Sequence, residues 1–340
     1  MILLKKKLFL LFFVFSVIIN LSANEFIHGN IKLTVNERAG NFSLFYLTDP
    51  QKRLYEPLFY NREPRSSYIL INFNGHIHRL DKYHFYRITT ELKNEFPVVN
   101  YEAGTFNVQM EFSPVKTLNS QETNGIKLTI TIFNKINRSV PAGLRLLLDT
   151  HLGEEKGNIP FFSNNLEITG ETRIESASGE TFWVSKGKEF SLMGSIIPHD
   201  RDSKVPDYLH FANWRRLNNA PWRLKFSSDR SFSSIPYSIR DSAVSYYYEP
   251  ETLESGKSFS YSIYLTTEDT GWYDIDYSRD ISVDTSSPIA YNYSEELLLM
   301  YSLQATLNRF IAGEIFLNED DLNDIEKSID RLKTRLNNNR

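Results

Sequence analysis

Residues 258–265 read SFSYSIYL, and residues 126–133 read IKLTITIF. In both stretches large apolar side chains alternate with small or polar ones, so one face would pack on a core and the other would face water. This two-residue period is typical of antiparallel strands. The same alternation recurs in residues 31–35, 68–73 and 105–112. The sequence therefore predicts antiparallel β-structure over most of the chain.

Short turn signals separate these predicted strands. They include Asn74-Gly75, Asn124-Gly125 and Ser255-Gly256, pairs that favour the left-handed backbone of tight turns. No long helical pattern lies between the strands, which argues against parallel βαβ units. We expect a mainly β fold, a large antiparallel β-sandwich of supersandwich type over residues 24–266.

The N-terminus has the three parts of a secretory signal peptide. Lys5, Lys6 and Lys7 precede an apolar run at residues 8–19, and the small residue Ala23 follows. The run is shorter than the roughly 20 residues that span a bilayer as a helix. We expect residues 1–23 to be a signal peptide, with cleavage after Ala23. An uncleaved anchor is the alternative, because the large Leu21 lies close to the expected cleavage position.

Composition narrows the function classes. The chain has no cysteine, which excludes disulfides, catalytic thiols and cysteine-ligated metals. The net charge of −4 becomes −7 when the three signal lysines are subtracted (−4 − 3). No long basic block is present, so nucleic acid is not an expected partner. We expect an exported protein, periplasmic or associated with the cell envelope, without a stable membrane span once the signal is removed.

The C-terminal part changes character. Residues 267–293 are acidic and serine-rich without a sustained period, and we interpret them as a linker. Residues 294–340 predict an α-helical hairpin, with Ser294 as the first cap. Its second helix carries an apolar seam with steps of three and four: Leu322, Ile325, Ile329, Leu332 and Leu336. Either the hairpin covers this seam itself, or the seam docks a protein partner.

One polar cluster follows an apolar strand. Residues 144–157 read LRLLLDTHLGEEKG, and Asp149 and His151 would share one face of that strand. Together with Glu154 from the next loop they make a possible site for a divalent cation. The alternative is structural, with the Asp149 carboxylate fixing the exit loop by accepting backbone hydrogen bonds. No other cofactor is indicated, and no nucleophile is visible beside His151 that would make it a general base.

A second conspicuous stretch is rich in tryptophan and arginine. Residues 210–226 read HFANWRRLNNAPWRLKF. Trp214 and Trp222 would be able to stack on sugar rings, with arginines meeting hydroxyl or carboxylate groups. They would equally serve as core side chains around a turn at Pro221. The spacing does not separate the two interpretations.

Three stretches in the same order carry a family resemblance. Residues 144–161, 211–226 and 246–265 resemble a family of exported bacterial β-sandwich domains of galactose-mutarotase type whose function is uncharacterised. The matching positions are Asp149, Thr150, Leu152, Gly153, Pro160, Phe161, Asn213 and Trp214. The resemblance implies a fold for about residues 28–266 and no particular chemistry. In related sequences the position of His151 is apolar, which counts against a catalytic histidine.

Two classes of function follow as expectations. The first is a non-catalytic exported scaffold or adaptor in an envelope assembly, with the C-terminal helices docking a protein partner. The resemblance also implies a setting in bacteria with periplasmic flagella. The second is carbohydrate binding or processing. An open cleft lined by Trp214 or Trp222 would favour carbohydrate binding or processing, and a filled cleft would favour the scaffold.

Overall fold

The computed structural model describes residues 24–60, 66–82, 85–117, 120–154, 158–164, 166–196, 203–237 and 241–267, together with residues 325–327, 329, 330 and 333. The predicted signal peptide and linker lie outside these residues, apart from Thr267, and so does most of the predicted helical hairpin. Ile325 and Ile329 are in helical backbone; Leu322, Leu332 and Leu336 lie outside the described residues. The hairpin therefore stays a prediction.

The predicted alternating strands are confirmed. Each of the five stretches forms a strand within three residues of its expected ends: β2 (Ile31–Val35), β5 (Tyr68–Phe73), β9 (Phe106–Val115), β10 (Gly125–Asn134) and β19 (Ser258–Thr266). Along β10 every second side chain is buried in the core, from Ile126 to Ile132. Among the described residues, no helix has the length and apolarity needed to cross a membrane.

Antiparallel pairing joins most strands into two large sheets. The nine-stranded sheet has the order β13 (Glu167–Ile168), β12 (Phe161–Ser163), β15 (Phe182–Lys186), β16 (Ser191–Ser195), β19, β10, β9, β8 (Phe96–Glu102), β7 (Arg87–Lys93). The six-stranded sheet has the order β14 (Thr172–Glu175), β17 (Tyr208–Asn213), β18 (Ser242–Leu253), β11 (Val140–Asp149), β5, β6 (His76–Arg79). The mainly β, antiparallel character of the fold is therefore confirmed.

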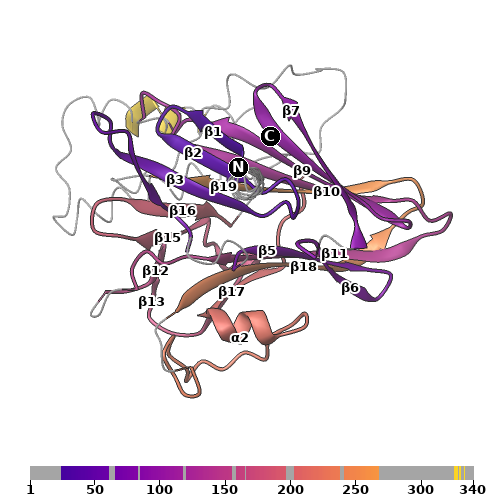
Figure 1. Cartoon of the computed structure of the whole chain (residues 1–340). Helices are drawn as coiled ribbons and strands as arrows, with labels where there is room; N and C mark the ends of the chain where they lie inside the picture. Colours follow the sequence, from indigo (N-terminus) through magenta and orange to yellow (C-terminus); the bar gives the residue numbers. More distant parts are fainter. Residues whose placement is uncertain are drawn as a thin grey trace, which may run out of the picture.

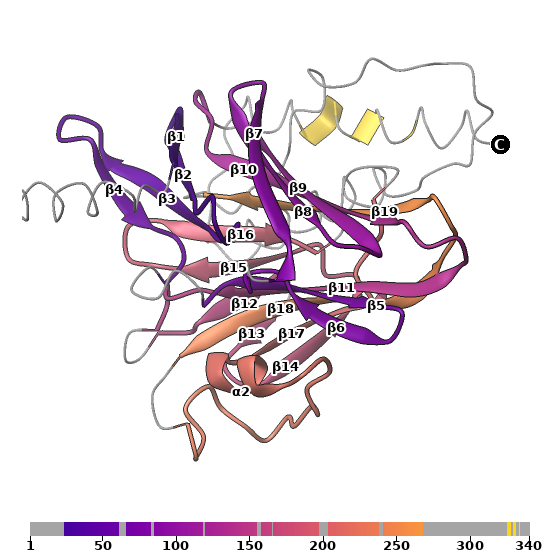
Figure 2. The same ribbon diagram turned by 45° about the vertical axis from the view of Figure 1, so that its right-hand side comes forward.

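The two large sheets lie face to face, with the core between them (Figures 1 and 2). Leu128 and Ile130 from β10 and Leu144 and Leu146 from β11 are fully buried in one apolar cluster. A polar link crosses the same core. Trp183 Nε1 in β15 donates to the Tyr246 hydroxyl in β18 at 2.6 Å. This pairing satisfies the one polar atom of a large buried indole.

A smaller four-stranded sheet extends the core beside the sandwich. Its order is β1 (Asn24–His28), β2, β3 (Phe42–Asp49), β4 (Leu54–Pro57). One face carries Leu33 and Leu44, which join the main core cluster. In both views this sheet lies at the upper left, on the side of the molecule away from α2 (Trp214–Asn219) (Figures 1 and 2).

Of the predicted turn signals, Asn74-Gly75 forms a turn and Asn124-Gly125 does not. Asn74 and Gly75 both have positive φ, 53° and 80°, and form the tight turn between β5 and β6 as predicted. Asn124-Gly125 instead opens strand β10. A Cβ at Gly125 would lie 2.6 Å from the Leu265 carbonyl oxygen, so glycine is needed there for close strand approach rather than for a turn.

Candidate functional site

The sequence landmarks meet at one end of the six-stranded sheet. Strand β11 ends at Asp149, β17 ends at Asn213, and β18 begins at Ser242, with Asn213 opposite Ser242 in register. The backbone N–H of Asp149 donates to Ser67 Oγ at 2.9 Å, just before β5. Stretches far apart in the sequence thus meet at the same end of this sheet, which is the arrangement expected of a functional site or of a structural junction.

Glu154 ties the loop after β11 to the start of β18. Its Oε1 accepts hydrogen bonds from the backbone N–H of Ser242 at 2.7 Å and from the Ser242 hydroxyl at 3.1 Å. Thr150 adds a bond from its hydroxyl to the Ser242 carbonyl oxygen at 3.4 Å. Gly153 has φ of 79°, a left-handed conformation that favours glycine. The loop is thereby held by its own short-range geometry and by β18.

The predicted metal set is not assembled. Asp149 is buried, with 3% of its surface exposed, and its carbonyl oxygen accepts from the N–H of Tyr60 at 2.9 Å. His151 is half-buried, and burial lowers the pKa of its imidazole; Nδ1 is enclosed without a hydrogen-bond partner. Within the described ranges, no three His, Asp or Glu side chains are placed to hold a metal ion. Asp149, His151 and Glu154 thus do not form a three-ligand group.

The two tryptophans are parts of a packed layer. Asn213 caps α2, its Oδ1 accepting from the N–H of Arg215. Trp214 is half-buried, and its Nε1 donates to the Ser66 carbonyl oxygen at 2.9 Å. Trp222 is only 8% exposed, and its Nε1 donates to Glu249 at 3.2 Å. Both indole N–H groups are therefore used within the protein, and the nearly buried Trp222 is not an open stacking platform.

We call residues 214–237 the strap, because this segment lies across the outer face of the six-stranded sheet (Figure 1). Leu217 and Trp222 of the strap pack with Tyr68, Leu70 and Leu147 of the sheet in a second apolar cluster, separate from the main core. Apolar burial of this kind stabilises by roughly 25 cal/mol per Å² of surface removed from water. The face is therefore filled.

Arg145 is the central residue under the strap, and the sequence analysis did not single it out. It is fully buried. Its guanidinium donates to Leu217 O at 2.8 Å, and to Ala220 O and Trp222 O at 3.0 Å each. Nε donates to the Ser245 hydroxyl at 2.9 Å. A buried cation is costly unless its donors are used, and these four bonds, three of them to carbonyl oxygens at or just after the C-terminal end of α2, engage most of the five N–H groups.

A row of stacked side chains extends from Arg145 toward the sheet edge. Its guanidinium carbon lies 5.0 Å from the ring centre of Tyr247, directly opposite in register. Tyr247 stacks on Tyr208 with ring centres 4.5 Å apart and planes 17° apart. Arg173 covers the other side of Tyr208 at 3.6 Å. The alternation of cations and rings is favourable, and it gives the outer face a continuous rigid layer.

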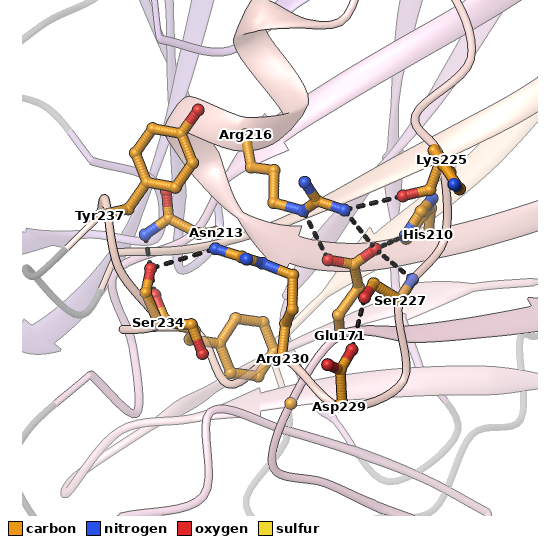
Figure 3. A network of polar contacts seen from close by, with 12 residues as sticks. Glu171, His210, Asn213, Arg216, Lys225, Ser227, Asp229, Arg230, Ser234 and Tyr237 are labelled. Carbon is orange, nitrogen blue, oxygen red and sulfur yellow. Dashed lines mark hydrogen bonds and ion pairs between the residues drawn. The ribbon is translucent and has the colours of Figure 1, made fainter.

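A buried carboxylate fixes the other side of the strap (Figure 3). Glu171 precedes β14, and its side chain is 2% exposed. Oε2 accepts from Arg216 Nε at 2.6 Å, while Oε1 lies 3.2 Å from His210 Nε2 and accepts from Ser227 N–H at 2.9 Å. Burial acts to raise the pKa of Glu171, but the hydrogen bonds and charge of His210 and Arg216 outweigh it and hold the pKa below its usual value.

The neighbouring carboxylate Glu249 is engaged in the same way. It accepts from Arg223 Nε at 2.7 Å and Nη2 at 2.8 Å, and from the Tyr208 hydroxyl at 3.2 Å. Burial raises its pKa, and the bonds from Arg223 and Trp222 outweigh this and lower it. Both carboxylates are thus ionised acceptors whose lone pairs are used within the protein. As placed here, each one stabilises the strap, whereas a general base needs a free lone pair within reach of a substrate proton.

No protein-family model and no curated protein matches the sequence. Three solved structures illustrate its structural likenesses. A candidate aldose 1-epimerase from Escherichia coli K12 has a TM-score of 0.43 and 10% identity, over 73% of this chain and 99% of that one. A galactose mutarotase related enzyme from Lactobacillus acidophilus has a TM-score of 0.38 and 8% identity, over 73% and 98%.

The third is a TPR-domain containing protein from Parabacteroides distasonis, with a TM-score of 0.43 and 12% identity, over 76% of this chain and 49% of that one. Two of the three carry names of the galactose-mutarotase type, the type that the three sequence stretches resemble. With these TM-scores and identities, the likeness transfers no site, substrate or activity to this chain.

Proposed function

We propose that this protein is an exported, non-catalytic scaffold or adaptor of a bacterial envelope assembly. The N-terminal basic patch and the apolar run at residues 8–19 support export. The sandwich supplies a rigid body, and the predicted C-terminal hairpin at residues 294–340 supplies the element that docks a protein partner.

One observation carries the choice of a scaffold over a carbohydrate protein. The outer face of the six-stranded sheet, where Trp222 and its neighbours gather, is filled by the strap, and Trp222 is 8% exposed. A sugar site needs an aromatic ring that is open on one side, with polar groups free to meet hydroxyls. Here the indole N–H of Trp222 and the Glu249 carboxylate bind each other.

The C-terminal seam supports docking. Ile329 is 36% exposed, and Ile325, one turn earlier on the same helical face, is half-buried. An apolar stripe on a helix is stabilised when another surface covers it. A partner of the assembly would complete that cover.

The test is a pull-down from native envelope with the tagged full chain. Ile325→Asp plus Ile329→Asp places two charges in the seam, each costly to bury unpaired, and co-purification of envelope proteins should be lost. Glu326→Gln plus Asp330→Asn is the matched control, because both side chains are exposed on the same helix. Retention of every partner by the seam variant, with its unfolding transition unchanged, would refute docking. Saturable changes of tryptophan fluorescence in a sugar titration would favour the carbohydrate alternative.

A further inference from the structure

The outer face of the four-stranded sheet carries an unusual row of side chains. In register, Ile27 lies opposite Lys32, Lys32 opposite Phe45, and Phe45 opposite Pro57. Leu47, two residues after Phe45 on the same face, lies opposite Tyr55. Ile27 is 58% exposed. These six residues, which we call the hairpin face, point away from the core side of the sheet, where Leu33 and Leu44 are fully buried.

The hairpin face surrounds one ion pair, in which Lys32 Nζ lies 3.4 Å from Glu25 Oε1 on the same side of the sheet. Lys32 Nζ lies 4.7 Å from the ring centre of Phe45 and 5.2 Å from that of Tyr55. An aliphatic side chain, two aromatic rings and a lysine whose stem lies along them make up the composition that favours a membrane–water interface. Lysine keeps its charge at the headgroups while its methylene stem stays in the apolar layer.

The charge of this part of the chain suits a membrane surface better than the rest does. Residues 24–60 hold four basic and four acidic side chains, so their net charge is zero, whereas the chain after residue 23 carries −7 in total. The remainder of the protein is therefore repelled by anionic headgroups, and the four-stranded sheet is not.

The chain connection brings the same sheet to the bilayer. Strand β1 begins at Asn24, and the apolar run that inserts during export ends at Ile19. Five residues reach roughly 17 Å at full extension. This is comparable to half of the roughly 30 Å hydrocarbon core. Until the expected cleavage after Ala23, this short connection keeps the β1–β4 sheet near the headgroup region; after cleavage, the hairpin face alone would hold it there.

We propose that the hairpin face is a membrane-contact surface, which rests on the lipid headgroups and orients the sandwich with its strap away from the bilayer. The inference rests on the export part of the proposed function. It places the strap and the sheet that it covers on the side available to partners, because the four-stranded sheet and α2 lie on opposite sides of the molecule (Figures 1 and 2). The occupant is the lipid surface itself, and a protein covering the same face is the competing outcome.

The absence of cysteine makes a direct test practical. Ile27→Cys in the full chain gives a single labelling site on the hairpin face, and Ile235→Cys gives a control on the strap, where Ile235 is 83% exposed. Both are labelled with an environment-sensitive fluorophore in envelope membranes. A lipid-borne quencher should reduce the emission at position 27 several-fold more than at position 235, and a water-soluble quencher should do the reverse.

Two outcomes would overturn the inference. Equal access of the water-soluble quencher to both labels would show that the face is free in solution. Shielding of position 27 from both quenchers would show that a protein covers it. N-terminal sequencing of the same sample separates this failure from failure of the proposed function. A chain that is not exported contradicts both the proposed function and the membrane-contact surface. An exported chain whose label at position 27 is accessible to water contradicts only the membrane-contact surface.

Discussion

Arg145 in β11 donates a hydrogen bond from Nη2 to the carbonyl oxygen of Leu217, 72 residues later, at 2.8 Å. This bond joins a fully buried guanidinium to the last turn of α2. It makes the strap part of the folded body rather than a loop over it. The hydrogen bonds of Arg145 to described residues all end on neutral oxygens, so the favourable partners of its charge are backbone dipoles and the Tyr247 ring.

Replacement of Arg145 by methionine should therefore destabilise the protein strongly. The change removes the Arg145 donor from the carbonyl oxygens of Ala220 and Trp222, at about 1–3 kcal/mol each, while Leu217 O keeps its bond from the Ala220 N–H. We expect the free energy of unfolding to fall by about 2 kcal/mol or more. Urea unfolding measures the loss, and amide hydrogen exchange should accelerate in residues 214–222. Arg223→Met is the control, because Arg223 is 68% exposed and an exposed ion pair contributes about 0–1 kcal/mol. Equal effects of the two changes would contradict the role of Arg145.

Glu171 gives the strap a dependence on pH. The pKa of its carboxyl is held below its usual value in the folded protein, so the ionised form is the one that binds His210 and Arg216. A carboxyl with a depressed folded pKa contributes stability above its unfolded pKa and loses it as pH falls through the folded pKa. Stability from this group should accordingly be full at neutral pH and decline in acid, below pH of about 4.5.

Glu171→Gln should show this dependence. At pH 7 the change breaks a buried ion pair, which typically costs about 3–5 kcal/mol. The difference in unfolding free energy between the parent and Glu171→Gln should shrink as pH is lowered from 7 to 3. Urea unfolding across that range checks it, with Glu175→Gln as the control, because the Glu175 side chain in β14 is 54% exposed. A difference that stays constant with pH would show that Glu171 acts by shape alone.

The alternating strands were predictable because each residue's neighbours two positions away report which face it occupies. β10 and β19 carry that pattern almost without exception, and the structure pairs them directly. The strap was not predictable. Its anchors at Arg145 are backbone carbonyl oxygens, which leave no trace in residue type. Glu171, His210 and Arg216 are brought together from positions 39 and 45 residues apart, where no local spacing links them.

The tryptophans illustrate the same limit. Trp214 and Trp222 have the composition of a sugar site, and a sequence shows composition but not whether a ring is covered. The loop after β11 was predictable in part, since Asp149 and Gly153 at a strand end indicate an anchored turn. The partner of that loop at Ser242 was not, because it lies 88 residues away.

Trp222 should behave as a packing residue. Trp222→Ala removes a side chain that is 92% buried (100 − 8) and should lower the free energy of unfolding by about 3–5 kcal/mol. Trp222→Phe keeps a ring but loses the bond to Glu249, and should cost less. Thermal and urea unfolding compare the two. A stable Trp222→Ala variant that has lost a measurable affinity for a sugar would instead assign the residue to a binding site.

Asp149 remains the residue at the junction whose substitution separates the structural and metal hypotheses. Asp149→Ala leaves intact the backbone bonds to Ser67 and from Tyr60, because they use main-chain atoms. Any loss of stability therefore reports the carboxylate itself, and we expect about 1–3 kcal/mol, the usual cost of leaving buried donors unpaired. Asp149→Asn, which keeps one acceptor oxygen, should lose less, and thermal unfolding of both variants measures the order. If a divalent cation were held there, elemental analysis would find it in the parent and not in Asp149→Ala. Loss of that metal with an unchanged melting temperature would reverse the assignment, because a loop anchor must change stability and a peripheral ligand need not.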